Sequence, residues 1–150
     1  MKVKDIMTRD VITLSPEMNV NNAATALFKL RKSGLPVVDE KNRVVGMFTE
    51  KDLIRLTLPS YVEHGEFVYL LDTGGFEKKA SELEGIKVGD VMRKEVICVN
   101  EDTPVTEVAR LMIVKTVRRI PVTRDDKLVG IVAREDIVKQ ILKHCCEADI

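Results

Sequence analysis

The chain contains one segment twice, and this internal duplication constrains its fold more than any other feature. Residues 43–55 read RVVGMFTEKDLIR, and residues 127–139 read KLVGIVAREDIVK. In each copy a short apolar run precedes an aspartate, Asp52 or Asp136, and an apolar pattern with helical spacing follows it. This pattern predicts a strand, a tight turn and a helix, with the aspartate in the first turn of the helix.

The duplication extends toward the N-terminus of each copy. Residues 3–35 align with residues 88–120, and one residue is then lost in the polar turn before the strand-turn-helix segment. Both copies contain apolar residues at positions i, i+3, i+4 and i+7, starting at Val20 and at Val105. This spacing is typical of an amphipathic helix that buries one stripe. We therefore expect both copies to adopt the same fold.

Within a copy, the sequence predicts a short leading helix, a strand, a helix, a strand after a proline, a further strand and a closing helix. The predicted strands before the turn are Val44 to Phe48 and Leu128 to Val132, and the first strands are Val11 to Leu14 and Val96 to Val99. Thr103 followed by Pro104 predicts a helix start, with a capping side chain and then proline at the first helical position.

The predicted fold class is α+β, with two βαββα repeats that each contain a small mixed sheet flanked by helices. We place the first repeat at 1–55, the connection at 56–87, the second repeat at 88–143 and a C-terminal tail at 144–150. One such repeat buries little apolar surface, so two repeats are expected to share a core.

The connection contains most of the aromatic residues of the chain, namely Tyr61, Phe67, Tyr69 and Phe76. Two interpretations remain open: a connection packed against the repeats, or an interaction surface or ligand-gated lid. Glu77 to Leu83 is expected to form a short helix.

The composition excludes several classes of protein. Basic and acidic residues balance to a net charge of zero, which argues against a nucleic-acid binder that relies on a broad basic surface. No apolar run is long enough for a membrane helix and no signal-peptide core is present, so we expect a cytoplasmic protein. The pair Cys145 and Cys146 follows His144 without CxxC spacing, and we expect reduced thiols and no metal site.

The repeated motif resembles that of the CBS domain, which usually occurs as tandem pairs called Bateman modules. The signature G-h-h-[ST]-x-x-D-h, where h is apolar, reads GMFTEKDL in the first copy and GIVAREDI in the second, after the segments LPV and IPV. The resemblance implies two repeats related by a pseudo-twofold axis, with clefts that bind AMP, ADP, ATP or S-adenosylmethionine. It also implies that the aspartate holds the ribose hydroxyls, and that the chain forms a homodimer.

The resemblance assigns residues from both repeats to each cleft. The first cleft would contain Met47, Thr49, Asp52, Cys98, Thr103, Val117, Arg118 and Arg119. The second cleft would contain Thr13, Met18, Lys32, Ser33, Ile131, Ala133 and Asp136. Cys98 departs from the family pattern, which usually has threonine there.

The two clefts are not expected to be equivalent. Arg118 and Arg119 have the chemistry to bind phosphate oxygens, although they also fit an ordinary solvated pair after a helix. We expect the first cleft to prefer a phosphorylated ligand, and the second to bind a less charged adenosine ligand or none.

A structural role competes with ligand binding at the aspartates. Thr49 and Asp52 fit a capping box, in which the aspartate stabilises the start of its own helix. Ala133 replaces the threonine in the second copy, so we expect capping to explain Asp136 less well.

The predicted function is a regulatory sensor that binds an adenosine-containing ligand and signals to a separate partner chain. The alternative is a dimerisation or scaffold module with vestigial clefts. A nucleotide-processing enzyme is the weakest hypothesis, because no Walker loop, GxSxG or HExxH motif is present and neither His64 nor His144 has a nucleophile nearby in sequence. We therefore expect no enzyme activity, no catalytic cofactor and no metal.

Overall fold

A computed structural model describes residues 1–58, 77 and 80–146 of the chain. The chain divides into two compact units, which are considered separately. Unit 1 consists of Met1–Ile12, Glu40–Val44 and Glu95–Ile150, and unit 2 consists of Thr13–Asp39 and Val45–Lys94. Within the described segments, no helix combines the length and apolar character needed to cross a membrane.

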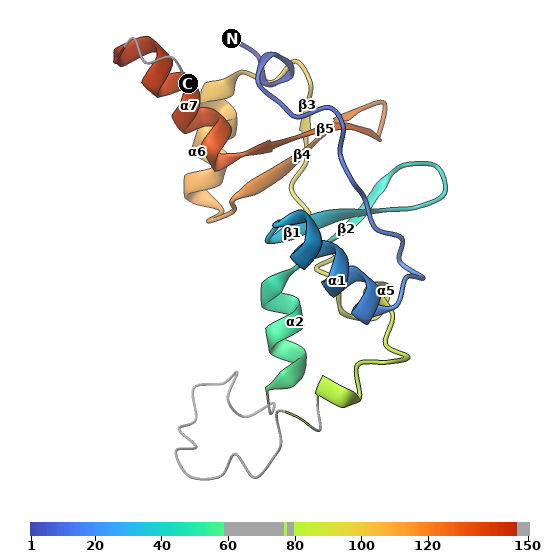
Figure 1. The fold of residues 1–150 in the computed structure, drawn as a ribbon. Helices are drawn as coiled ribbons and strands as arrows, with labels where there is room; N and C mark the ends of the chain where they lie inside the picture. Colours follow the sequence, from blue (N-terminus) through green and yellow to red (C-terminus); the bar gives the residue numbers. More distant parts are fainter. Residues whose placement is uncertain (59–76, 78–79, 147–150) are drawn as a thin grey trace. The chain divides into compact units, whose positions relative to one another are not determined.

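Unit 1 is a mixed three-stranded sheet with helices beside it (Figure 1). Strand β4 lies in the centre, parallel to β3 and antiparallel to β5, and helices α6 and α7 contact each other as well as β4 and β5, respectively. The elements are η1 (Val3–Asp5), β3 (Val99–Asn100), α6 (Val105–Val114), β4 (Arg119–Arg124), β5 (Lys127–Ala133) and α7 (Arg134–Cys145). This arrangement confirms the predicted α+β class.

Unit 2 repeats this plan with a smaller sheet. Leu14 forms a parallel bridge with Val37 of the first strand, at the position where β3 pairs with β4 in unit 1. The elements are α1 (Val20–Leu30), β1 (Gly34–Val38), β2 (Val44–Thr49), α2 (Glu50–Thr57) and α5 (Val88–Val91). Val44, the first residue of β2, still belongs to unit 1.

Several predicted boundaries differ from the structure, and the strands expected after each proline include that proline. The strand expected at Val11 to Leu14 is only the Leu14 bridge, and the one expected at Val96 to Val99 is Val99–Asn100. Pro104 is the N-cap of α6 and is not its first helical residue, since its ψ of 142° is extended.

The connection between the repeats falls mostly outside the described residues. Residues 77, 80 and 81 are helical, in agreement with part of the helix expected at Glu77 to Leu83, whereas Leu83 lies in a turn. The expectations for Tyr61, Phe67, Tyr69 and Phe76 lie outside the described residues.

Each compact unit includes the leading segment of the other repeat. In unit 1, the backbone N–H of Val3 donates to the carbonyl of Thr103 at 2.8 Å, and Thr8 forms an antiparallel bridge with Ile131. In unit 2, the N–H of Val88 donates to the carbonyl of Met18 at 2.8 Å. The leading segments have therefore exchanged places between the two repeats.

The exchanged valines complete the two hydrophobic cores. Val3 and Val88 are both fully buried. The core of unit 1 consists of Val3, Met7, Val99, Val108, Met112, Ile120, Val122 and Val132. The core of unit 2 consists of Leu14, Val20, Ala23, Leu27, Leu35, Val37, Phe48 and Val88. Without Val3 or Val88, each core would lack one of its fully buried side chains.

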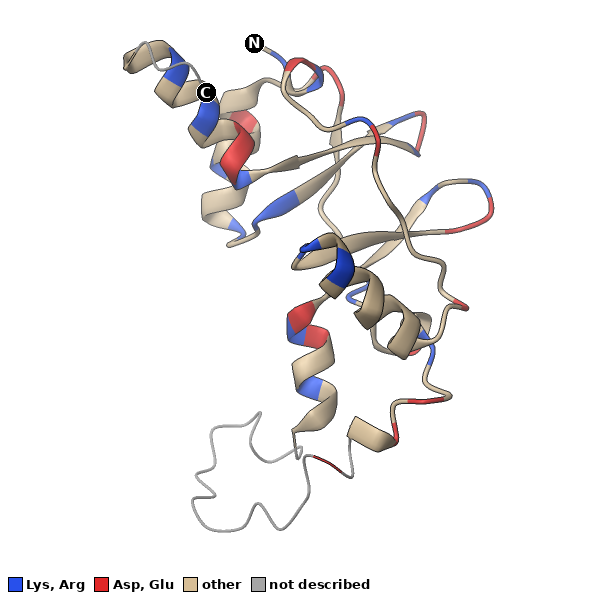
Figure 2. Cartoon of the chain, in the orientation of Figure 1, with Lys and Arg blue, Asp and Glu red and all other residues tan. Residues whose placement is uncertain are grey.

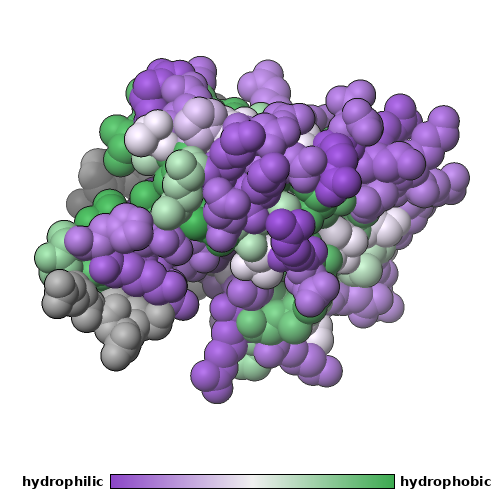
Figure 3. Space-filling view, turned by 90° about the horizontal axis from the view of Figure 1, so that it is seen from above, coloured by the Kyte–Doolittle hydropathy of each residue, from purple (hydrophilic) through white to green (hydrophobic). Residues whose placement is uncertain are grey.

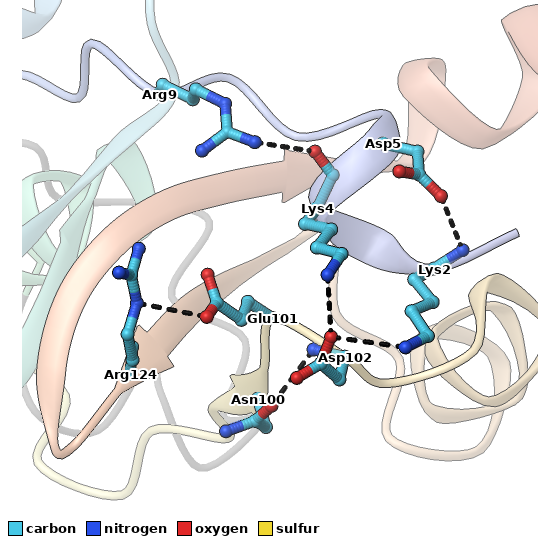
Figure 4. A network of polar contacts seen from close by, with 8 residues as sticks. All are labelled: Lys2, Lys4, Asp5, Arg9, Asn100, Glu101, Asp102 and Arg124. Carbon is cyan, nitrogen blue, oxygen red and sulfur yellow. Dashed lines mark hydrogen bonds and ion pairs between the residues drawn. The ribbon is translucent and has the colours of Figure 1, made fainter.

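A polar network reinforces the docking of the leading segment in unit 1 (Figure 4). The ammonium groups of Lys2 and Lys4 lie 3.3 Å and 2.9 Å from one carboxylate oxygen of Asp102. The hydrogen bonds from both lysines lower the pKa of Asp102, and the one from Lys4 has the larger effect. Nearby, Arg124 pairs with Glu101 at 3.0 Å. These contacts join the first residues of the chain to the loop that precedes α6.

Candidate functional site

The turn from β2 to α2 positions Asp52, the first candidate ribose-binding residue. Thr49 is the extended N-cap and Asp52 is the third residue of the helix. The Asp52 side chain is buried, with 7% of its surface exposed. Its Oδ2 accepts hydrogen bonds from the Thr49 backbone N–H at 2.9 Å and from the Thr49 hydroxyl at 3.1 Å. Asp52 thus stabilises the start of its own helix.

Asp136 makes the same capping contact in the second copy. Its Oδ2 accepts a hydrogen bond from the backbone N–H of Ala133 at 2.7 Å. The expectation that capping explains Asp136 less well is therefore wrong. The contact uses the backbone N–H of the N-cap residue, so it does not require a hydroxyl at that position.

Two further aspartates show that this capping contact is a general device in the chain. Asp5 accepts from the N–H of Lys2 at 2.9 Å, and Asp90 accepts from the N–H of Lys87 at 3.3 Å. Asp5 and Asp90 are the third residues of the short leading helices, and they belong to neither predicted cleft. A capping contact alone therefore does not mark a binding residue.

The two copies differ in how the strand before the turn is packed. A side chain on Gly34 would lie 2.9 Å from the Thr49 methyl group, so glycine leaves room for threonine. In the second copy the residue at the position of Gly34 is Arg119, and its partner in the β4–β5 register is Ala133. Glycine is therefore paired with threonine in the first copy, and arginine with alanine in the second.

Each turn is also bonded to the segment that precedes its proline-containing strand. The N–H of Glu50 donates to the carbonyl of Ser33 at 2.9 Å, and the N–H of Arg134 donates to the carbonyl of Arg118 at 2.9 Å. Within each unit, the structure therefore joins the aspartate turn to this segment of the same repeat.

The predicted cleft residues divide between the two units. Unit 2 contains Met47, Thr49 and Asp52 of the first cleft, with Thr13, Met18, Lys32 and Ser33 of the second. Unit 1 contains Cys98, Thr103, Val117, Arg118 and Arg119 of the first cleft, with Ile131, Ala133 and Asp136 of the second. The predicted combination of residues from both repeats in one cleft stays a prediction.

Several of these residues have structural roles in their own unit. Met47 is 8% exposed and its backbone forms a bridge with Arg93, whereas Met18 and Val117 pack against the cores of unit 2 and unit 1. The backbone of Ile131 bonds to Thr8 in both directions at 2.9 Å. These contacts are made mainly by the backbone or by core packing, which leaves the polar side chains as the candidates for ligand recognition.

Cys98, which departs from the family pattern, is an exposed residue whose thiol is still partly desolvated. This desolvation raises the pKa of the Cys98 thiol. The side chain is therefore a neutral, weak hydrogen-bond donor at pH 7, in a position where a threonine hydroxyl would form a stronger bond.

Arg55 forms an ion pair with Asp52 that the sequence motifs did not predict. Its guanidinium lies 3.3 Å from Oδ1 of Asp52, so it pairs with the second oxygen of the carboxylate. The three-residue spacing between Asp52 and Arg55 on a helix is the signal that would have identified this pair.

Basic and acidic residues are interspersed along the chain in both units (Figure 2). No group of three or more potential metal ligands occurs among the residues whose placement is described.

Comparison with known proteins identifies relatives over most of the chain. The sequence profile of the CBS domain matches residues 3–58 and 88–143. Inosine-5'-monophosphate dehydrogenase of Methanocaldococcus jannaschii is 33% identical over 140 residues, which are 93% of this chain and 23% of that enzyme. The similarity therefore covers only a small part of the dehydrogenase.

Solved structures of CBS-domain proteins resemble the fold of the whole chain. The CBS-pair protein CBSX2 of Arabidopsis thaliana has a TM-score of 0.78 and 30% identity, with 95% of this chain and 94% of that chain covered. The chain spans 63% of full-length CBSX2. A structure of CBSX2 in complex with AMP has a TM-score of 0.74 and 29% identity, with 95% and 96% covered.

A second solved relative was determined with two different ligands. The CBS domain pair of MJ0100, in complex with 5-methylthioadenosine and S-adenosyl-L-methionine, has a TM-score of 0.70 and 27% identity. The alignment covers 94% of this chain and 99% of that chain. All the ligands of these two relatives contain adenosine.

Proposed function

We propose that this chain, which belongs to the CBS domain family, is a regulatory module that binds an adenosine-containing ligand through Asp52 and Asp136. The candidate ligands are AMP, ADP, ATP and S-adenosylmethionine. We further propose that the bound ligand lies in clefts between the two repeats, and that binding is signalled to a separate partner chain in an energy-sensing role. The protein has no catalytic activity in this proposal.

The observation that carries the proposal is the position of the two aspartates in the signatures GMFTEKDL and GIVAREDI, which distinguishes them from the capping residues Asp5 and Asp90. In both copies the backbone N–H of the N-cap residue donates to Oδ2 of the carboxylate, which holds the side chain at the first turn of the helix. A carboxylate in this position can accept hydrogen bonds from the two vicinal hydroxyls of a ribose. The N-terminus of the same helix carries a partial positive charge, which suits a phosphate group.

The ligands of the relatives support the same ligand class. CBSX2 and MJ0100 were crystallised with AMP and with 5-methylthioadenosine and S-adenosyl-L-methionine, respectively. Adenosine is the part that these ligands share, and its ribose is the group that we assign to the aspartates.

Calorimetric titration of nucleotide-stripped protein with the four ligands tests the proposal. We expect micromolar binding, about −8 kcal/mol, that weakens in Asp52→Asn or Asp136→Asn. Asparagine is preferred to alanine because its side-chain oxygen can still accept the capping hydrogen bond. Flat heats for every ligand on folded protein would contradict the proposal.

A second candidate function is a dimerisation scaffold, and the helices of both units provide an observation in its favour. Phe28 on α1 is 86% exposed and Ile113 on α6 is 79% exposed. Figure 3 shows hydrophobic surface between hydrophilic side chains in one view. Because the duplication places an apolar residue at the same helical position in both repeats, we propose that a second copy of the chain covers these faces.

The cytoplasm remains our proposed location. CBSX2 is described as chloroplastic, so localisation of the tagged, full-length protein in its own cells is the appropriate test. Exclusion of the protein from the cytoplasm would contradict this part of the proposal.

A further inference from the structure

We propose that the two aspartates bind ribose unequally, and that Asp136 is the site of tighter binding because donors of the chain itself already occupy Asp52. This inference rests on the proposed function. The sequence predicted a different contrast, in which the first cleft prefers a phosphorylated ligand and the second binds a less charged adenosine ligand or none.

The hydrogen-bonding capacity of the two carboxylates differs. An ionised carboxylate has two oxygens with about four acceptor positions in total. Asp52 uses both oxygens, since Oδ2 accepts from the Thr49 N–H and hydroxyl and Oδ1 accepts from Arg55. Two ribose hydroxyls therefore have to displace at least one of these donors.

Asp136 has more capacity available. Among the described residues, its only hydrogen bond is the one that Oδ2 accepts from the Ala133 N–H at 2.7 Å. Its side chain is also less buried than that of Asp52, which is 7% exposed. Asp136 can therefore accept both hydroxyls of a ribose while it keeps its capping bond.

Two substitutions between the repeats explain this difference. The turn hydroxyl of Thr49 is absent at Ala133, where the neighbouring strand carries Arg119 in place of Gly34. The residue that corresponds to Arg55 is Lys139, and no ion pair between Lys139 and Asp136 is found in the described part of the chain. Both of the extra donors at Asp52 are thus specific to the first repeat.

The experiment is calorimetric titration of the nucleotide-stripped, full-length protein with AMP. We expect Asp136→Asn to weaken the tighter binding event by about tenfold or more, because a charge-assisted hydrogen bond is lost. Asp52→Asn should weaken the looser binding event and not the tighter one. Circular dichroism of each variant checks that it is folded.

Three further variants test the cause of the difference. Arg55→Gln should tighten binding at Asp52 several-fold in the Asp136→Asn background, whereas the matched control Lys139→Gln should not tighten binding at Asp136. Ala133→Ser adds a hydroxyl beside Asp136 without adding a methyl group, and it should weaken the tighter event. Unchanged affinity in both Arg55→Gln and Ala133→Ser would overturn the inference.

The outcomes separate this inference from the proposed function. If AMP, ADP, ATP and S-adenosylmethionine all give flat heats on folded protein, the proposed function fails. If AMP binds but the tighter event is lost in Asp52→Asn and kept in Asp136→Asn, the proposed function stands and only this inference is overturned.

Discussion

At the scale of single residues, the glycine of the repeated motif is explained by packing. Gly46 lies within β2 and Gly130 within β5. A side chain on Gly46 would meet the Met92 side chain and, at 2.9 Å, the carbonyl of Arg93. A side chain on Gly130 would meet Met7 and, at 2.9 Å, the carbonyl of Thr8. Each glycine therefore admits the methionine of the exchanged leading segment.

We predict that Gly46→Ala and Gly130→Ala each destabilise the protein by about 1–3 kcal/mol, the usual effect of overpacking. The methionine side chains can move aside, but the backbone carbonyls cannot do so without loosening the leading segment. Urea denaturation measures the change. As a control, Met92→Ala should lower the free energy of unfolding less in the Gly46→Ala background than in the wild type. In the double variant, the alanine at 46 occupies part of the space that the methionine side chain has left. An unchanged denaturation midpoint in both glycine variants would contradict this account of the motif.

The chemistry of Cys98 provides a prediction about pH. Since desolvation raises the pKa of its thiol, the thiolate fraction at pH 7 to 8 is lower than that of an unperturbed thiol with a pKa of about 8.5. In a Cys145→Ser/Cys146→Ser background, we expect alkylation of Cys98 by iodoacetamide to be slower than that of a free cysteine at pH 8, and to accelerate at higher pH. A rate equal to that of the free amino acid at pH 8 would contradict the raised pKa.

At the scale of elements, the helices carry most of the large apolar side chains that the described residues expose. Phe28, Ile54, Ile113 and Ile141 lie on α1, α2, α6 and α7, and each is more than half exposed. Phe28 and Ile113 occupy equivalent positions in the two repeats. An apolar face that recurs on a monomer surface is typical of an interface with another protein.

We predict that Phe28→Ser and Ile113→Ser each weaken self-association of the chain, with at least a tenfold increase in the dissociation constant. Analytical ultracentrifugation over a range of concentrations provides the measurement. Ile12 is 51% exposed but lies outside the helices, so Ile12→Ser is the matched control and should have little effect. A wild-type protein that remains monomeric at high concentration would rule out the proposed dimer.

At the scale of the whole molecule, the sequence repeats and the compact units do not coincide. The leading segment of each repeat packs into the unit built mainly from the other repeat, where Val3 and Val88 are fully buried. Residues 40–44 also belong to unit 1. There the backbone N–H of Leu128 donates to the carbonyl of Asn42, and the side-chain amide of Asn42 donates to the carbonyl of Leu128, both at 3.0 Å. A sequence repeat is therefore not a complete folding unit.

This exchange predicts which fragments fold. Residues 13–94 contain every member of the core of unit 2, so we expect this fragment to unfold cooperatively on heating. Residues 1–58 cover the first sequence repeat but lack Val88 and the segment that pairs with Met47, so we expect this fragment to be largely unfolded. Circular dichroism during thermal denaturation compares the two fragments. Cooperative unfolding of 1–58 as a monomer would contradict the exchange.

The sequence alone determined the duplication, the helices and the strand-turn-helix segments, because these depend on local periodicity and on residues close together in the chain. The apolar spacing from Val20 and Val105 predicted α1 and α6, and the positions of Asp52 and Asp136 at the helix starts were confirmed. The contact between each aspartate and its N-cap residue could also be predicted from the sequence, because the two residues are close in the chain. The sequence did not show that this contact forms without the hydroxyl of Thr49.

Only the tertiary structure decided which repeat each leading segment packs against. Val3 and Val88 are identical residues in equivalent positions, so either valine fits the pattern of either core. The choice depends on contacts between residues far apart in the chain, such as Val3 with Thr103, and local periodicity contains no information about them. The packing around Gly46, Gly130 and Gly34 also could not be read from the sequence, because the residues that contact them come from separate segments.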